Sequence, residues 1–152
     1  MHHITHRIGI KAPATLVFQA LSTLEGLGGW WTEDVSGNPA VGGNIEFAFR
    51  TPSGELLGKM VMEVRELSQP HVVRWHCIAG SKDWMGTDIT FELTEQDNVT
   101  ILIFGHRNWR EANEFSAHCS MKWATFLLSL RAFVETGKGR PSPDDLKIDN
   151  WN

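Results

Sequence analysis

Apolar residues recur with helical spacing in the C-terminal part of the chain, from Phe115 to about Glu135. The spacings of three, four and seven residues place these side chains on one face of an α-helix. Polar residues such as His118, Lys122 and Ser129 fall on the opposite face. The pattern predicts a helix about 30 Å long whose apolar stripe is Cys119, Trp123, Phe126, Leu127, Leu130, Phe133 and Val134.

Upstream of this helix, apolar and polar residues alternate over short segments, which is typical of strands with one buried face. Glycine and polar residues at 53–54 and 96–98 predict hairpin turns between neighbouring segments. The strands are expected at His3–Ile10, Asn44–Arg50, Gly58–Leu67, Val72–Ile78, Thr87–Glu95 and Val99–His106.

One further helix is expected after the first strand, because Pro13 suits a helix start and an apolar stripe follows it. Glycines at 26, 28 and 29 are expected to end this helix. Trp30 and Trp31 then lie in a glycine-rich turn, where two adjacent side chains are not expected to face the same way. The order of elements is a strand, a helix with an optional second helix after it, five strands and the long helix. It predicts an α+β fold, with an antiparallel sheet and the helices on one side.

Length and composition favour a single domain over residues 1–152, with an extended, proline-containing tail at 138–152. The net charge of −4 and the scattered basic residues argue against nucleic-acid binding. No apolar run is long enough to span a bilayer, and the start of the chain lacks the apolar core of a signal peptide. We therefore expect a cytoplasmic protein without membrane insertion, with Cys77 and Cys119 as reduced, buried thiols.

The seven histidines raise the question of a metal site. His2, His3 and His6 lie on a predicted strand, and no cysteine or carboxylate cluster completes a ligand set. The chain also lacks a phosphate-binding loop, a dinucleotide fingerprint and a nucleophile elbow. The sequence predicts neither a metal nor a cofactor.

Several local strings, in this order of elements, resemble the START-like helix-grip superfamily, also called SRPBCC. Within it they resemble the bacterial branch named after activators of heat-shock-protein-90 ATPase, which is also described as polyketide cyclase-like. The resemblance covers nearly the whole chain and implies a curved antiparallel sheet wrapped around the long C-terminal helix, with a hydrophobic cavity between them. It supplies no catalytic residue set. The strings include IKAPATLVFQAL at 10–21, GWWTEDVSGNPAVGG at 29–43 and HCSMKWATFLLSLRAFVETGKGRP at 118–141.

Aromatic residues are the main candidates for the lining of such a cavity, because their flat faces and single N–H donors suit aromatic ligands. Filling of the core is the alternative role for the same side chains. Trp84 and Trp109 are expected in loops at the cavity mouth. The candidate ligand-binding residues are Trp30, Trp31, Phe47, Met62, Trp75, Trp84, Phe91, Phe104, His106, Trp109, Cys119 and Trp123.

His106 is the candidate catalytic residue, because it shares a strand face with Leu102 and Phe104 and is expected to point into the cavity; His6 could do likewise. A histidine held by hydrogen bonds within the core is the alternative. The leading hypothesis is a binding protein for a small hydrophobic or aromatic ligand. Two alternatives are a cyclase- or hydrolase-type enzyme and a stress-related, co-chaperone-like interaction module, so enzymatic activity stays open.

A homodimer is a further hypothesis. Met121 and Leu128 lie seven residues apart on one flank of the C-terminal helix, and Ile101 and Ile103 face away from the predicted cavity. If these four side chains were exposed together, they would form an apolar patch suited to self-association.

Overall fold

The computed structural model describes residues 1–152. Its elements, in chain order, are β1 (His2–Ile10), α1 (Ala14–Ser22), α2 (Leu24–Trp30), β2 (Asp34–Gly37), β3 (Asn44–Arg50), β4 (Leu56–Ser68), β5 (Val72–Ala79), β6 (Asp88–Gln96), β7 (Val99–Trp109) and α3 (Glu114–Thr136).

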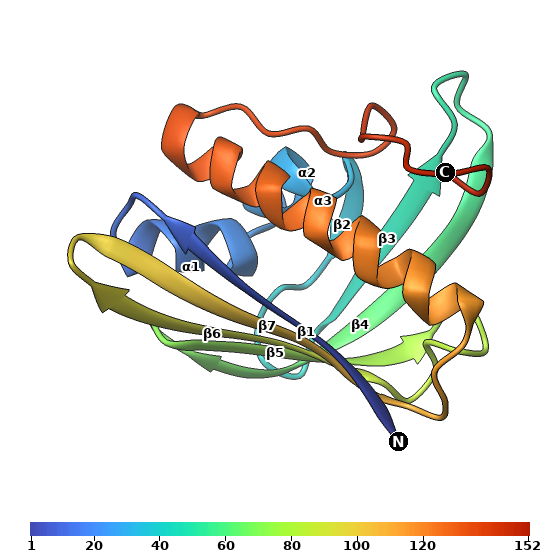
Figure 1. Ribbon diagram of the computed structural model, residues 1–152, viewed down its shortest axis with the longest axis horizontal. Helices are drawn as coiled ribbons and strands as arrows, with labels where there is room; N and C mark the ends of the chain where they lie inside the picture. Colours follow the sequence, from blue (N-terminus) through green and yellow to red (C-terminus); the bar gives the residue numbers. More distant parts are fainter.

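All seven strands form one antiparallel sheet in the order β1-β7-β6-β5-β4-β3-β2. The sheet is strongly curved, and α3 crosses its concave side together with α1 and α2 (Figure 1). This arrangement confirms the predicted α+β helix-grip fold. The strand β2 was not predicted, because its four residues are mostly exposed and carry no alternation of apolar and polar positions.

The register of the strands places apolar residues opposite one another on the concave face. Ile45 pairs with Met62, and Phe91 pairs with Phe104. Directly opposed residues of antiparallel strands point to the same face. These pairs are fully buried and form the side of the core against which α3 packs.

The sequence predicted that the glycines at 26, 28 and 29 end a helix. This prediction was wrong, because all three lie within α2. Close packing explains two of them. A Cβ at Gly26 would lie 2.6 Å from the Cα of Ala20 in α1, and a Cβ at Gly29 would lie 2.3 Å from the ring of Phe133 in α3. The absence of side chains therefore allows α2 to fit between the two other helices.

The helix α3 has well-formed ends. Asn113 accepts a hydrogen bond from the backbone N–H of Ser116 and begins the helix, and Gly137 ends it in a left-handed conformation with φ of 86°. The face of α3 that carries the polar residues, opposite the apolar stripe, is partly buried: Lys122 is 8% exposed and Ser129 is 5% exposed.

The C-terminal segment explains this burial. After α3 the chain turns back and runs along the helix towards β3 and β4 (Figure 1). Ser142 fixes its course, because its N–H donates to the carbonyl of Trp31 over 2.8 Å and its carbonyl accepts from the N–H of Glu33 over 3.1 Å. We call residues 140–152 the C-terminal strap.

A substitution of Gly26 by alanine tests the packing of α2. We expect Gly26→Ala to lower the free energy of unfolding by about 1–3 kcal/mol, because its Cβ would overlap the backbone of α1. Gly28 provides the matched control in the same helix, since its Cβ would lie 3.5 Å from the nearest atom. Gly28→Ala should leave the stability unchanged or raise it by up to about 1 kcal/mol. Urea unfolding measures both, and equal effects would contradict this account of α2.

Candidate functional site

Aromatic side chains fill the interior between the sheet and α3. Trp31 lies at the centre, with its ring centroid 4.3 Å from that of Phe47, 5.9 Å from that of Trp75 and 4.9 Å from that of Trp123. Trp30 and Trp31 were expected to face different ways. Both side chains are instead buried, and their rings stack with a centroid separation of 6.0 Å. This arrangement occurs at the point where α2 ends.

His106 lies in this core, and both of its ring nitrogens are used. Its Nδ1 accepts a hydrogen bond from the indole N–H of Trp123 over 3.0 Å. The hydroxyl of Thr87 donates to the carbonyl of Trp84 over 2.6 Å, and therefore accepts from Nε2 of His106 over 2.9 Å. These contacts select the neutral imidazole. They join the loop before β6, the strand β7 and the helix α3.

Burial also favours the neutral form of this imidazole. It lowers the pKa of His106 from 6.5 to about 3, against the weaker opposing effect of Asp88. The imidazole is therefore neutral at pH 7. Neither nitrogen is free to contact a ligand, because both are hydrogen-bonded within the core. His6 is likewise engaged, since its Nε2 lies 3.1 Å from the carbonyl oxygen of Ser120 in α3.

A cleft of about 380 Å³ opens beside this core. Phe49, Gly58 and Met60 of β3 and β4 line one wall, and Phe115, Cys119 and Phe126 of α3 line the other. Trp31, Trp84 and Trp123 also line it, and Trp151 and Asn152 of the C-terminal strap close one side. The family resemblance implied a cavity between the sheet and the helix. The structure has instead a cleft that opens to the surface.

Four of the candidate ligand-binding residues line this cleft: Trp31, Trp84, Cys119 and Trp123. The others lie in the core and do not contribute to the lining, namely Trp30, Phe47, Met62, Trp75, Phe91, Phe104, His106 and Trp109.

Several lining residues are not among the candidates predicted from the sequence. Phe49 and Met60 belong to the inward-facing sets of their strands, so the alternation could have identified them. Phe115 and Phe126 belong to α3, whose stripe was recognised. Trp151 could not be placed, because its position depends on the path of the C-terminal strap.

Two features of the lining affect its chemistry. Burial raises the pKa of the Cys119 thiol to about 12, so this sulfur is a poor nucleophile at neutral pH. The indole N–H of Trp84 is buried without an oxygen or nitrogen acceptor and interacts with the sulfur of Cys119, a weak acceptor that also lines the cleft. Trp109, expected at the mouth, is buried beneath Phe115, and its N–H is unpaired.

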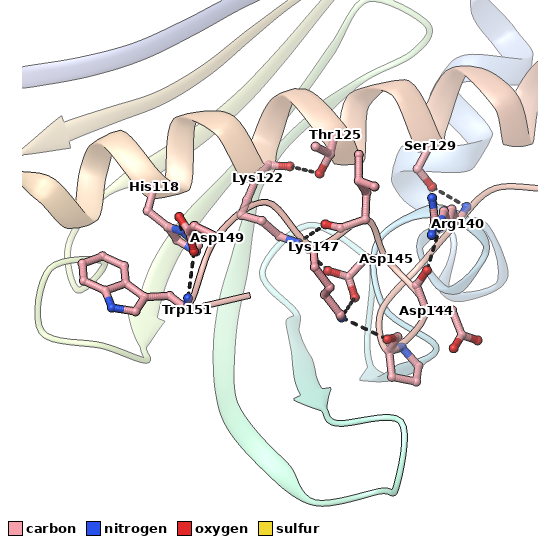
Figure 2. A network of polar contacts seen from close by, with 12 residues as sticks. His118, Lys122, Thr125, Ser129, Arg140, Asp144, Asp145, Lys147, Asp149 and Trp151 are labelled. Atoms are coloured by element: carbon pink, nitrogen blue, oxygen red, sulfur yellow. Dashed lines mark hydrogen bonds and ion pairs between the residues drawn. The ribbon is translucent and has the colours of Figure 1, made fainter.

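The C-terminal strap is attached to α3 by a row of polar contacts (Figure 2). The imidazole of His118 bonds Asp149 over 2.7 Å, and the hydroxyl of Ser129 accepts from the N–H of Arg140 over 2.7 Å. Between them, Lys122 donates to the carboxylate of Asp145 and to the carbonyl of Leu146.

Asp145 is the central acid of this row, since its carboxylate is 1% exposed and also accepts from Lys147 over 2.9 Å. Burial alone would favour the protonated acid, but the hydrogen bonds from the two ammonium groups outweigh it and hold the pKa of Asp145 below its usual value. The carboxylate is therefore ionised at neutral pH and fixes the strap to the helix.

The structure contains no group of three or more His, Cys, Asp or Glu side chains placed to hold a metal ion. None of its helices combines the length and the apolar character needed to cross a bilayer.

Comparison with known proteins agrees with this architecture. Residues 11–135 match the family described as activator of Hsp90 ATPase homolog 1-like protein. The chain belongs to this family. The resemblance stated from the sequence is thus confirmed, and the helix-grip fold is that of other family members.

Solved structures give the same result. The solution structure of the Aha1 dimer from Colwellia psychrerythraea is 44% identical, with a TM-score of 0.77, and the alignment covers 91% of this chain and 100% of that one. CalU16 from Micromonospora echinospora shares the fold at 17% identity, with a TM-score of 0.69 and coverage of 89% and 77%. The protein SSP2350 from Staphylococcus saprophyticus does so at 17% identity, with a TM-score of 0.71 and coverage of 93% and 98%. No curated protein matches the chain.

The buried histidine predicts a specific dependence of stability on pH. The unfolded chain binds a proton at this imidazole below about pH 6.5, whereas the folded protein does so only near pH 3. Between these values the free energy of unfolding should fall by about 1.4 kcal/mol for each unit that the pH falls, and above pH 6.5 this contribution is constant.

Denaturant unfolding at several pH values, compared with a His106→Gln variant, isolates this contribution, because the other titrating groups are common to both proteins. The variant should be less stable at pH 7 and should lack the extra slope below pH 6.5. Parallel profiles would show that the imidazole titrates freely in the folded state.

Proposed function

We propose that this protein binds a small apolar or aromatic molecule in the cleft between β3, β4, α3 and the C-terminal strap. The cleft itself carries this proposal. Its volume of about 380 Å³ lies in the range typical of small-molecule sites, and such sites are mostly apolar with a few polar groups. Aromatic rings occupy the neighbouring interior between the sheet and α3.

A binding role is favoured over a catalytic one by the contacts of the ionisable groups. General acid–base catalysis requires a side chain that can exchange a proton with the bound molecule. His106 is enclosed and has both nitrogens engaged. In the cleft, Lys122 is paired with Asp145 of the C-terminal strap, and His118 is engaged through Nδ1 alone, by Asp149. The co-chaperone-like role stays a prediction drawn from the family resemblance.

Gly58 offers a direct way to block the cleft. It lies opposite Phe49 in the sheet, so a side chain at this position points to the same face, towards Trp31 and the cleft. A Cβ at this position would meet nothing within 4 Å. A large residue can therefore enter the cleft without displacing the core.

We expect Gly58→Trp to weaken the binding of any cleft ligand by about tenfold or more, while Gly58→Ala, which leaves the cleft open, should bind as the wild type does. Ligands are first found by a thermal-shift screen of aromatic acids, fatty acids and polycyclic phenols, since binding to the folded state raises the melting temperature. Isothermal titration then measures the affinities. A ligand that binds equally to both variants would place the site elsewhere.

We also propose that two copies of the chain associate through the exposed flank of α3. Met121 is 57% exposed and Leu128 is 48% exposed, and the 44% identical relative is a dimer. Ile101 and Ile103 do not belong to this patch, because they lie on the convex face of the sheet, opposite Leu102, Phe104 and α3.

Sedimentation equilibrium tests this association. The double variant Met121→Glu, Leu128→Glu should be monomeric at concentrations where the wild type is dimeric, since burying the new carboxylates would be costly. Leu16→Glu is the control, because Leu16 is an exposed apolar residue of α1. A monomeric wild type at high micromolar concentration, or a dimer that survives the double substitution, would contradict the proposal.

A further inference from the structure

We infer that the molecule bound in the cleft is an amphipathic anion, with an apolar body and one carboxylate or similar group, and that Lys122 attracts this group. The inference rests on the proposed binding function and adds the chemical class of the ligand. Three observations support it: the sign of the charges around the cleft, the composition of the ion cluster at Lys122, and the hydrogen-bonding character of the other polar groups.

The first observation is that no aspartate or glutamate lines the cleft, although the whole chain has a net charge of −4. The basic residues of the lining are Lys59, His118 and Lys122. Lys59 is set aside, because its side chain points to the convex face of the sheet and lies 3.6 Å from Glu46. His118 and Lys122 are therefore the ionisable side chains on the cleft side, together with the buried thiol of Cys119.

The second observation is an excess of positive charge at Lys122. The ammonium groups of Lys122 and Lys147 share the single carboxylate of Asp145. His118 has its own partner in Asp149. The cluster of the buried Lys122 and Asp145 with the exposed Lys147 thus carries one positive charge that no side chain in contact with it compensates. An anion in the adjacent cleft would reduce this imbalance.

The third observation is that the other polar group buried in the lining is a donor. The indole N–H of Trp84 has no oxygen or nitrogen acceptor, which is rare for a buried group in a folded protein. Its one interaction is with the sulfur of Cys119, which is a weak acceptor. Trp84 stacks on Trp123 with a centroid separation of 6.0 Å, and Trp123 follows Lys122 in the chain. A ligand with acceptor oxygens matches this lining better than a ligand with donor groups such as an amine.

Three probes of the same size and different charge test the inference on the wild-type protein. They are 2-naphthoate, 2-naphthylmethanol and 2-naphthylmethylammonium. We expect the anion to bind about tenfold more tightly than the alcohol, equivalent to about 1.4 kcal/mol, and the cation to bind more weakly than the alcohol. The preference for the anion should decrease at high salt, because screening weakens interactions between charges near the surface.

A pair of variants tests the role of Lys122. Lys122→Met and Lys147→Met each remove one positive charge from the same cluster, and each leaves Asp145 with one lysine partner. Only Lys122 lines the cleft. We expect Lys122→Met to abolish the preference for 2-naphthoate over the alcohol, and Lys147→Met to retain most of it. The affinity for the alcohol, measured in each variant, is the reference against which this preference is taken.

The outcomes separate this inference from the proposed function. If none of the three probes binds, and the screen finds no other cleft ligand, the binding function itself fails. If the alcohol binds as tightly as the anion in the wild type, the cleft still binds ligands and the inference about charge is overturned. Equal losses in the two lysine variants would show attraction by overall charge and would overturn the assignment to Lys122. The wild-type comparison decides the ligand class even if a variant is unstable.

Discussion

The contact between Trp123 and His106 fixes how the helix meets the sheet. The indole N–H donates to Nδ1 over 3.0 Å, and the same indole packs on Trp31 and Phe104. A buried hydrogen bond of this kind is costly to leave unmade, so the centre of α3 cannot move away from β7. The aromatic rings then fill the space between them. The remaining space lies beside this contact, towards β3 and β4, and forms the cleft.

The C-terminal strap determines the other side of the cleft. Without it, Lys122 and Ser129 would lie on a solvated helix face. With it, the face is buried, Asp145 is paired with two lysines, and Trp151 and Asn152 lie against the cleft. Removing one partner of a buried ion pair is strongly destabilising, because the other charge is left unpaired. Here the loss of either lysine leaves Asp145 paired with the other one. The same residues thus hold the strap and give the cleft its positive character.

The alternation of apolar residues was enough to predict the six long strands and α3, because burial of one face imposes a period that the sequence displays directly. The interior of α2 was missed, since its glycines are there for close packing against Ala20 and Phe133, which no local pattern shows. The site was predicted in part. Trp31, Trp84, Cys119 and Trp123 line the cleft, but periodicity shows only which side chains point inward. Whether an inward side chain meets another ring, as His106 and Phe91 do, or open space depends on how the rings pack in three dimensions, which periodicity does not encode.

The central claim is that the interior is closed by aromatic packing and that the binding site is the cleft under the C-terminal strap. A crystal structure of the protein soaked with 2-naphthoate tests it most directly. The account predicts density for the naphthyl ring between Gly58, Phe115 and Trp151, with the carboxylate towards Lys122. Density for the ring inside the sheet, beside His106 and Phe91 with those side chains displaced, would contradict it.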